Sequence, residues 1–323
     1  MTLRADYLVD RRRLKRSVSL WRALAVIAVL GVIAVLTLQN DDVATALGYR
    51  SHIARLEISG LIQQDSKRLK LLKDIGESKS AKAVILRINS PGGTTVGGEA
   101  LYTAILELRE KKPVVAVFST VATSAAYMTG IATDRIVARG STITGSVGVI
   151  LQWAEINELL AKLGVQMQEV RSGPLKAVPS PFRPLNEEGR ELTRQMVDES
   201  KKWFIALVAK RRSIDPETVP GLTAGRIYSG REALKLKLID QIGGEDEAIA
   251  WLEENRDVPK KLKIIDWKTS DSQSFGWFGA AITQVAAWTG LPVTVVNSVL
   301  GPGSALERVR LDGLISVWHA QQD

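Results

Sequence analysis

The chain has no cysteine and only two histidines, His52 and His319, among its 323 residues. Without cysteine no disulfide can form, and this absence says little about the compartment. Histidine is the usual base for an activated serine, so its scarcity narrows the chemistry open to the chain. If the protein is a hydrolase with a serine nucleophile, lysine is the best remaining base, because a neutral lysine amine can accept the serine proton.

The positive charge is concentrated at one end of the chain. The formal net charge is +8, but residues 1–22 hold seven basic residues against two acidic ones. The other residues therefore carry a net charge of only +3. A basic tail of this kind argues against a nucleic-acid-binding surface, and we expect no nucleic-acid partner.

The basic tail leads into a long apolar run, Ala23–Leu38, which contains no charged residue. A helix of that length spans about 24 Å, slightly less than a bilayer core. Extension back to Val18 gives a full span, because Arg22 can snorkel to the interface and Trp21 suits the headgroup zone. The sequence thus predicts a single transmembrane anchor.

The charges on either side of the run predict its orientation. Basic residues precede it and Asp41 and Asp42 follow it, which places the N-terminus in the cytoplasm. We therefore expect a single-pass membrane protein, with the rest of the chain periplasmic or extracytoplasmic. A cleaved signal peptide is the alternative, with a small-residue site at Ala44–Ala46. The run exceeds a usual secretory core, which favours a retained anchor.

Strand-like and helix-like segments alternate beyond a linker, and this predicts an α/β fold with a largely parallel sheet. Helical patterns cover Gly98–Lys112 and Glu187–Arg212, the second after an N-cap candidate, Asn186. Five apolar, often β-branched runs predict buried strands: His52–Ile58, Ala83–Ile88, Val114–Phe118, Arg135–Ala138 and Val165–Val170.

Two residues stand out for their local sequence. Ser124 lies among small residues just after the third predicted strand, a setting that resembles a nucleophile elbow. Close helix packing would explain those small residues equally well. Lys176 follows Gly-Pro-Leu and precedes Ala-Val-Pro, an uncharged setting that would favour the neutral amine a general base requires. An ordinary solvated lysine is the alternative.

Other candidates also follow predicted strands, at the sheet edge where α/β proteins bind ligands. Gly92 and Gly93 allow a tight turn with exposed amides, suited to an oxyanion hole, although Pro-Gly-Gly also occurs in ordinary turns. Ser146 supplies a hydroxyl that could orient a neutral lysine, although structural turn hydroxyls would explain its segment as well.

In combination and order, these motifs closely resemble the signal peptide peptidase A family of membrane-anchored bacterial Ser-Lys proteases. The resemblance runs from about Ile53 to Trp251, in the short, single-repeat form of the family. It departs from the family at Ser124-Ala125-Ala126-Tyr127, where Ser-Gly-Gly-Tyr is usual. The motifs that carry it are Asn89–Gly93, the Ser124 turn, Thr144–Val149, Ser172–Lys176 and Gly225–Ala233.

The resemblance implies a Clp protease/crotonase-like fold with an N-terminal transmembrane helix, in which Ser124 is the nucleophile and Lys176 the general base. It implies an oxyanion site at Gly92 and Gly93, with the backbone of Ala125. The expected substrates are hydrophobic peptides such as cleaved signal peptides, and no cofactor or metal is expected. Family members form rings in which a neighbouring subunit contributes the lysine, so we expect a homo-oligomer at the bacterial inner membrane.

The resemblance also predicts the domain organisation, and two alternative functions stay open beside it. We expect a basic tail (1–22), an anchor (23–38), a linker (39–52), a peptidase domain (53–255) and a C-terminal extension of unknown role (256–323). A crotonase-type acyl-CoA enzyme would share the fold, but would need no anchor. A catalytically inactive membrane scaffold is the other alternative, suggested by the Ser-Ala-Ala departure.

Overall fold

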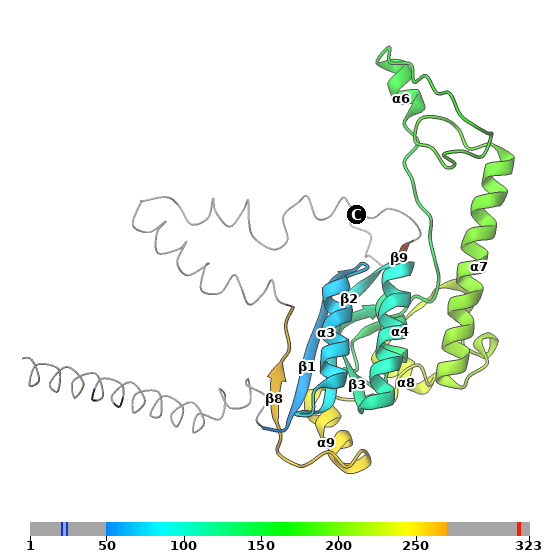
Figure 1. Ribbon diagram of the computed structural model, residues 1–323. Helices are drawn as coiled ribbons and strands as arrows, with labels where there is room; N and C mark the ends of the chain where they lie inside the picture. Colours follow the sequence, from blue (N-terminus) through cyan, green and yellow to red (C-terminus); the bar gives the residue numbers. More distant parts are fainter. Residues whose placement is uncertain (1–20, 22–23, 25–49, 270–314, 318–323) are drawn as a thin grey trace, which may run out of the picture.

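The structure, a computed structural model, describes residues 50–269, Trp21, Leu24 and the backbone of residues 315–317 (Figure 1). Nearly all of the predicted basic tail and anchor and most of the C-terminal extension lie outside the described residues. Within the described part, no helix is long and apolar enough to cross a membrane.

A largely parallel sheet forms the centre of the molecule, as the alternation of segments predicts. Its strand order is β6-β5-β3-β2-β1-β8, with β4 paired to β3 and β7, and β9 paired to β2. The pairs β5–β6 and β2–β9 are antiparallel and the others are parallel. The strands are β1 (His52–Ile62), β2 (Ala81–Thr94), β3 (Val114–Thr123), β4 (Arg135–Ala138), β5 (Ile143–Gly145), β6 (Ile227–Ser229), β7 (Gln241–Ile242), β8 (Lys263–Asp266) and β9 (Ile315–Val317).

Helices cover both faces of this sheet because alternate strand residues point to opposite sides. On β2, Val84, Leu86 and Ile88 belong to the core cluster that contains the helices α3, α4 and α5, whereas Ala83 and Ile85 pack with α9. The helices are α3 (Ser66–Glu77), α4 (Thr95–Lys111), α5 (Ala125–Ile131), α6 (Asn157–Lys162), α7 (Glu187–Arg212), α8 (Gly230–Lys235) and α9 (Glu245–Asn255), with short 3₁₀ turns at η1 (Pro216–Thr218) and η2 (Leu222–Ala224).

Most predicted elements are confirmed. The strand Arg135–Ala138 and the helix Glu187–Arg212 have the predicted bounds, and the Asn186 side chain accepts a hydrogen bond from the Gly189 amide at 2.9 Å. The predicted strand Val165–Val170 is wrong, because this segment is exposed and has no strand assignment. In the described part of the chain this segment pairs with no strand, and it lies between α6 and α7, away from the sheet (Figure 1).

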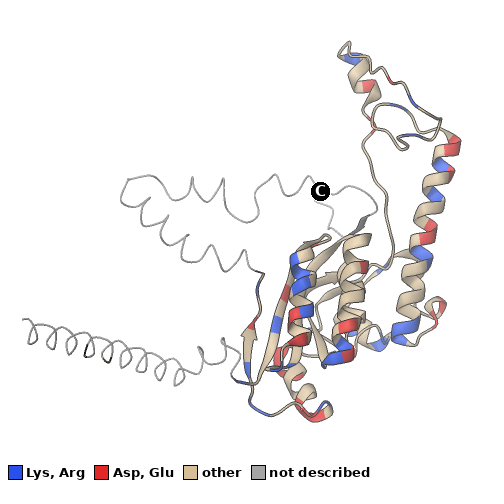
Figure 2. Ribbon diagram, viewed as in Figure 1, with Lys and Arg blue, Asp and Glu red and all other residues tan. Residues whose placement is uncertain are grey.

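Residues 151–186, which we call the arm, project from the sheet domain at the N-terminal end of α7 (Figure 1). The 26 residues of α7 span about 39 Å, and the helix carries alternating acidic and basic side chains (Figure 2). Helix α6, within the arm, has no buried residue. Large apolar side chains are exposed in the arm at Leu159, Leu163, Val165, Met167, Val170 and Phe182.

Candidate active site

Ser124 occupies a sharp turn between β3 and α5, as predicted. Its backbone has φ 59° and ψ −121°, a conformation that costs a non-glycine residue about 1–3 kcal/mol. Two backbone hydrogen bonds hold this turn: the Ser124 amide donates to the Gly145 carbonyl at 2.8 Å, and the Ser124 carbonyl accepts from the Met128 amide at 2.9 Å. The strain is therefore fixed by the surrounding sheet and by the first turn of α5.

The side chain of Ser124 does not cap helix α5. Serine at an N-cap normally accepts a hydrogen bond from a backbone amide of the first turn. Ser124 is the N-cap of α5 but makes no side-chain capping bond, and the residue is 1% exposed. A strained serine whose hydroxyl has no capping role is typical of a nucleophile elbow.

The predicted tight turn at Gly92 and Gly93 is wrong, because both residues lie at the end of β2, where they pair with Leu61 and Ile62 of β1 and with β9. This end of β2 lies beside Ser124 because β2 and β3 are cross-linked just before it. Thr123 donates its hydroxyl hydrogen to the Pro91 carbonyl at 3.0 Å, and Asn89 accepts from the Val121 amide at 3.3 Å. Sequence reasoning did not assign these roles, although the Asn-Ser-Pro-Gly-Gly motif contains two of the residues involved. The cross-links bring the predicted oxyanion site to the predicted nucleophile.

Both glycines at this end of β2 are required by geometry. Gly92 has φ 109°, and a Cβ on Gly93 would lie 1.8 Å from the Ile62 carbonyl oxygen. The Gly92 amide donates to the hydroxyl of the fully buried Ser90 at 3.1 Å. An oxyanion must therefore displace Ser90 before it can use the Gly92 amide, while Ala125 supplies an amide from the first position of α5.

Ser146 is also brought to the elbow. In the parallel pair of β3 and β5, Thr123 lies opposite Gly145, so Ser124 and Ser146 follow paired positions. Ser146 has φ 54°, and its amide donates to the Arg226 carbonyl at 2.9 Å. This position suits the predicted role of a hydroxyl that orients a base beside Ser124.

Lys176 lies in the arm, and its own chain does not bring it to the elbow. The residue is exposed, its amide donates to the Gly173 carbonyl at 3.2 Å, and its carbonyl accepts from Arg183 at 3.2 Å. The uncharged sequence around Lys176 therefore does not bury it within one chain. A shared dyad would need a second chain to place this amine at a serine.

The elbow has no other base from its own sheet. In the described part of the chain, the buried polar residues at the elbow are Ser90, Thr123, Thr142 and Thr144, and all of them carry hydroxyls. His52 begins β1, and in a parallel sheet this lies at the edge opposite the end of β3. His319 lies outside the described residues.

Tyr127, three residues after Ser124, is not a candidate base. It is fully buried and donates its hydroxyl hydrogen to the Leu238 carbonyl at 2.9 Å. Burial raises the pKa of this phenol well above its usual range, so Tyr127 stays protonated and anchors α5 to the loop before β7.

Together, an α/β sheet, a strained serine elbow and the neighbouring glycine end of a strand define a class of serine hydrolase site. The model of "Peptidase family S49" matches residues 107–259, a range that includes both Ser124 and Lys176. The chain is 38% identical over 204 residues to "Putative protease slr0021" of Synechocystis sp., covering 62% of this chain and 73% of the relative. The chain therefore belongs to peptidase family S49, the signal peptide peptidase A family.

A second relative agrees with this assignment. The chain is 33% identical over 232 residues to "Putative signal peptide peptidase SppA" of Enterococcus faecium, covering 71% of this chain and 66% of that protein. Among solved structures, it is similar to a mutant of the 1510-N membrane-bound stomatin-specific protease, with a TM-score of 0.46 and 16% sequence identity. That alignment covers 68% of this chain and 99% of the other.

Proposed function

We propose that the protein is a membrane-anchored serine endopeptidase with a Ser124–Lys176 dyad and a Clp protease/crotonase-like fold. Its substrates are hydrophobic peptides such as cleaved signal peptides. The single observation that supports this function best is the strained, buried Ser124 elbow in a chain of a peptidase family. The name of the Enterococcus faecium relative, a signal peptide peptidase, supports the substrate class.

In the proposed reaction, the neutral amine of Lys176 takes the hydroxyl proton while Ser124 Oγ attacks the scissile carbonyl carbon. Backbone amides at the Gly92–Gly93 end of β2 and of Ala125 stabilise the oxyanion, and the lysine returns its proton to the leaving amine as the C–N bond breaks. Water then attacks the acyl ester and gives a proton to Lys176. As the C–Oγ bond breaks, Lys176 gives this proton to Ser124 Oγ, which restores both the serine hydroxyl and the neutral amine.

We propose further that the dyad forms between two chains of a homo-oligomeric ring. Lys176 belongs to an arm that stands away from its own sheet domain, and α6 in that arm has no buried residue. Apolar side chains such as Leu163, Val165 and Val170 are 68%, 46% and 104% exposed. A second copy of the chain is the partner that would cover them and receive the lysine.

The membrane location supports the same substrates. The predicted anchor at 23–38 would hold the catalytic domain beside the bilayer, outside the cytoplasm, where hydrophobic peptides are released. Its retention is part of the proposal, since the anchor lies outside the described residues.

Covalent labelling tests the chemistry directly. A fluorophosphonate probe should label the wild-type chain at Ser124 and leave Ser124→Ala unlabelled, whereas Ser141→Ala, at an exposed serine, should be labelled normally. An unlabelled wild type would favour the inactive scaffold. Tight binding of a coenzyme A thioester without labelling would favour the acyl-CoA enzyme. Labelling retained in Ser124→Ala would point to Ser90 or Ser146 instead.

A further inference from the structure

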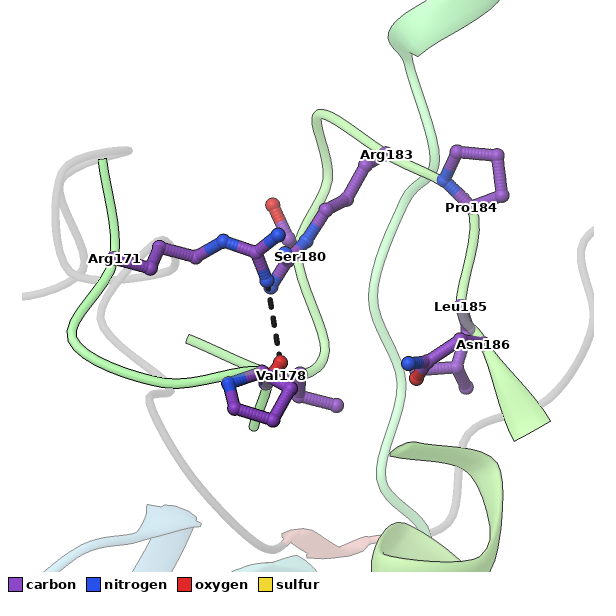
Figure 3. Close-up of a pocket in the computed structure, with 8 residues that line it drawn as sticks. Arg171, Val178, Ser180, Arg183, Pro184, Leu185 and Asn186 are labelled. Carbon is purple, nitrogen blue, oxygen red and sulfur yellow. Dashed lines mark hydrogen bonds between the residues drawn. The ribbon is translucent and has the colours of Figure 1, made fainter. Parts of the chain in front are cut away.

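The loop that carries Lys176 has few buried side chains. Among residues 171–180, only Ser180 is buried. Beside the loop lies a cavity of about 200 Å³, lined by both polar and apolar side chains (Figure 3). A loop that borders such a cavity depends on hydrogen bonds for its shape.

Those hydrogen bonds come from two arginines that reach the cavity from different parts of the arm (Figure 3). Arg183 donates from one nitrogen, Nη2, to the Lys176 carbonyl at 3.2 Å and to the Ala177 carbonyl at 2.9 Å. Arg171 donates to the Pro174 carbonyl at 3.2 Å. The two guanidinium groups therefore bind three carbonyls across four residues that include Lys176.

One carboxylate connects the two arginines. Glu169 Oε2 lies 3.5 Å from Arg171 Nε and 3.8 Å from Arg183 Nη1. All three side chains are partly shielded from solvent, with exposed fractions of 34%, 22% and 29% for Arg171, Arg183 and Glu169. We call Glu169, Arg171 and Arg183 the arginine clamp.

The clamp stabilises the loop at a residue whose backbone conformation is strained. Ala177, next to Lys176, has φ 60°, a left-handed conformation that disfavours residues with a Cβ. Its carbonyl accepts the shorter of the two Arg183 hydrogen bonds. Arg183 thus stabilises the turn that sets the direction in which the lysine leaves the loop.

We propose that Arg183 is a positioning residue for Lys176, and that Glu169 and Arg171 hold it in that role. This inference rests on the proposed function, in which Lys176 is the general base. An amine presented to a neighbouring chain must arrive in one geometry, and a displacement of about 1 Å can cost about 100-fold in rate. The clamp fixes that geometry before the chains meet.

The test compares Arg183→Ala and Arg183→Lys with Arg190→Ala in the full-length protein. Arg190 is a matched control, because its side chain is 64% exposed and pairs only weakly with Glu187 on the same helix. We expect Arg183→Ala to lower kcat for a hydrophobic peptide by about 10- to 100-fold with KM nearly unchanged. Arg183→Lys should recover part of this loss, and Arg190→Ala should match wild type.

Thermal melting and the mass of the assembly separate positioning from folding. Both should be unchanged in Arg183→Ala. Glu169→Gln, a milder change to the same clamp, should lower kcat less. Turnover in Arg183→Ala equal to that in Arg190→Ala would overturn the inference, as would a loss that appears only together with a loss of melting temperature or assembly in both clamp variants.

Lys176→Ala distinguishes failure of the inference from failure of the proposed function. If Lys176→Ala keeps turnover, the lysine is not the base and the proposed function itself is wrong. If Lys176→Ala is inactive while Arg183→Ala is fully active, the dyad stands and only the positioning role is refuted.

Discussion

At the scale of single residues, the backbone of Ser124 is as informative as its hydroxyl. Its positive φ would be relieved by glycine, yet serine occupies the position and makes no helix-capping bond with its side chain. Strain of this kind is kept where surrounding structure fixes it, here through Gly145 and Met128. The conformation therefore supports a chemical role for Ser124 over a packing role.

Substitution of Ser124 separates chemistry from strain. Ser124→Ala keeps a Cβ and should lose peptidase activity with an unchanged melting temperature. Ser124→Gly should also be inactive, but more stable by about 1 kcal/mol, because relief of strain exceeds the extra chain entropy of glycine. Peptide turnover and a circular dichroism melt measure both effects. Wild-type turnover in either variant would refute the assignment of the nucleophile.

A substitution of Thr123 tests whether the hydrogen bond between β3 and β2 positions Gly92 and Gly93 beside the nucleophile. Thr123→Val removes the hydrogen bond to the Pro91 carbonyl while keeping the shape of the side chain. We expect a stability loss of about 1 kcal/mol, because the half-buried Pro91 carbonyl loses its donor, and a clear fall in kcat. Thr133 lies just after the C-terminal end of α5, and Thr133→Val removes similar hydrogen bonds, to the carbonyls of Gly130 and Arg135. It should cost similar stability without lowering kcat, and equal loss of turnover in both variants would contradict the account.

At the scale of elements, the arm is the segment whose large apolar side chains are not buried in the core of its own chain. The sheet and its helices bury their apolar residues on both faces, whereas the arm exposes Leu159, Leu163 and Val170. Exposed apolar side chains gathered on one projecting segment indicate a surface that a partner covers. This is the element-scale basis for assembly through the arm.

A charge placed on the arm should test that surface. Val170→Asp should lower the assembled mass in solution and reduce peptide turnover, because the charge would have to be desolvated against a second chain. Val96→Asp is the control, since Val96 is 57% exposed on α4 of the sheet domain. Mass measured by light scattering should change only for Val170→Asp, and an unchanged assembly would remove the arm from the interface.

The sequence is sufficient to predict elements that have strong local signals. It is insufficient where contacts between distant segments determine the structure. Helix Glu187–Arg212 was predicted because Asn186 caps an apolar-periodic segment, and the Ser124 turn because small residues follow a buried run. The strand predicted at Val165–Val170 is wrong, because an apolar run gives the same sequence pattern whether a sheet or a partner chain buries it. The engagement of the Gly92 amide by Ser90 and the distance of Lys176 from the elbow depend on folding, which local spacing does not encode.

At the scale of the whole molecule, the proposal requires the catalytic domain to lie outside the cytoplasm. A periplasmic reporter fused after Asp323 should be active, because basic residues precede the predicted anchor at 23–38 and acidic ones follow it. A cytoplasmic reporter in the same place should be silent. Activity of the cytoplasmic reporter would contradict the orientation, and a mature chain that begins after Ala46 would favour a cleaved signal peptide.

The central claim is that one chain's Lys176 serves another chain's Ser124, and mixed assemblies test it most directly. Ser124→Ala and Lys176→Ala chains are each expected to be inactive alone. After subunit exchange, verified by mass, the mixture should regain peptide turnover, because some interfaces then pair an intact serine with an intact lysine. Confirmed exchange without any return of turnover would contradict a dyad shared between chains.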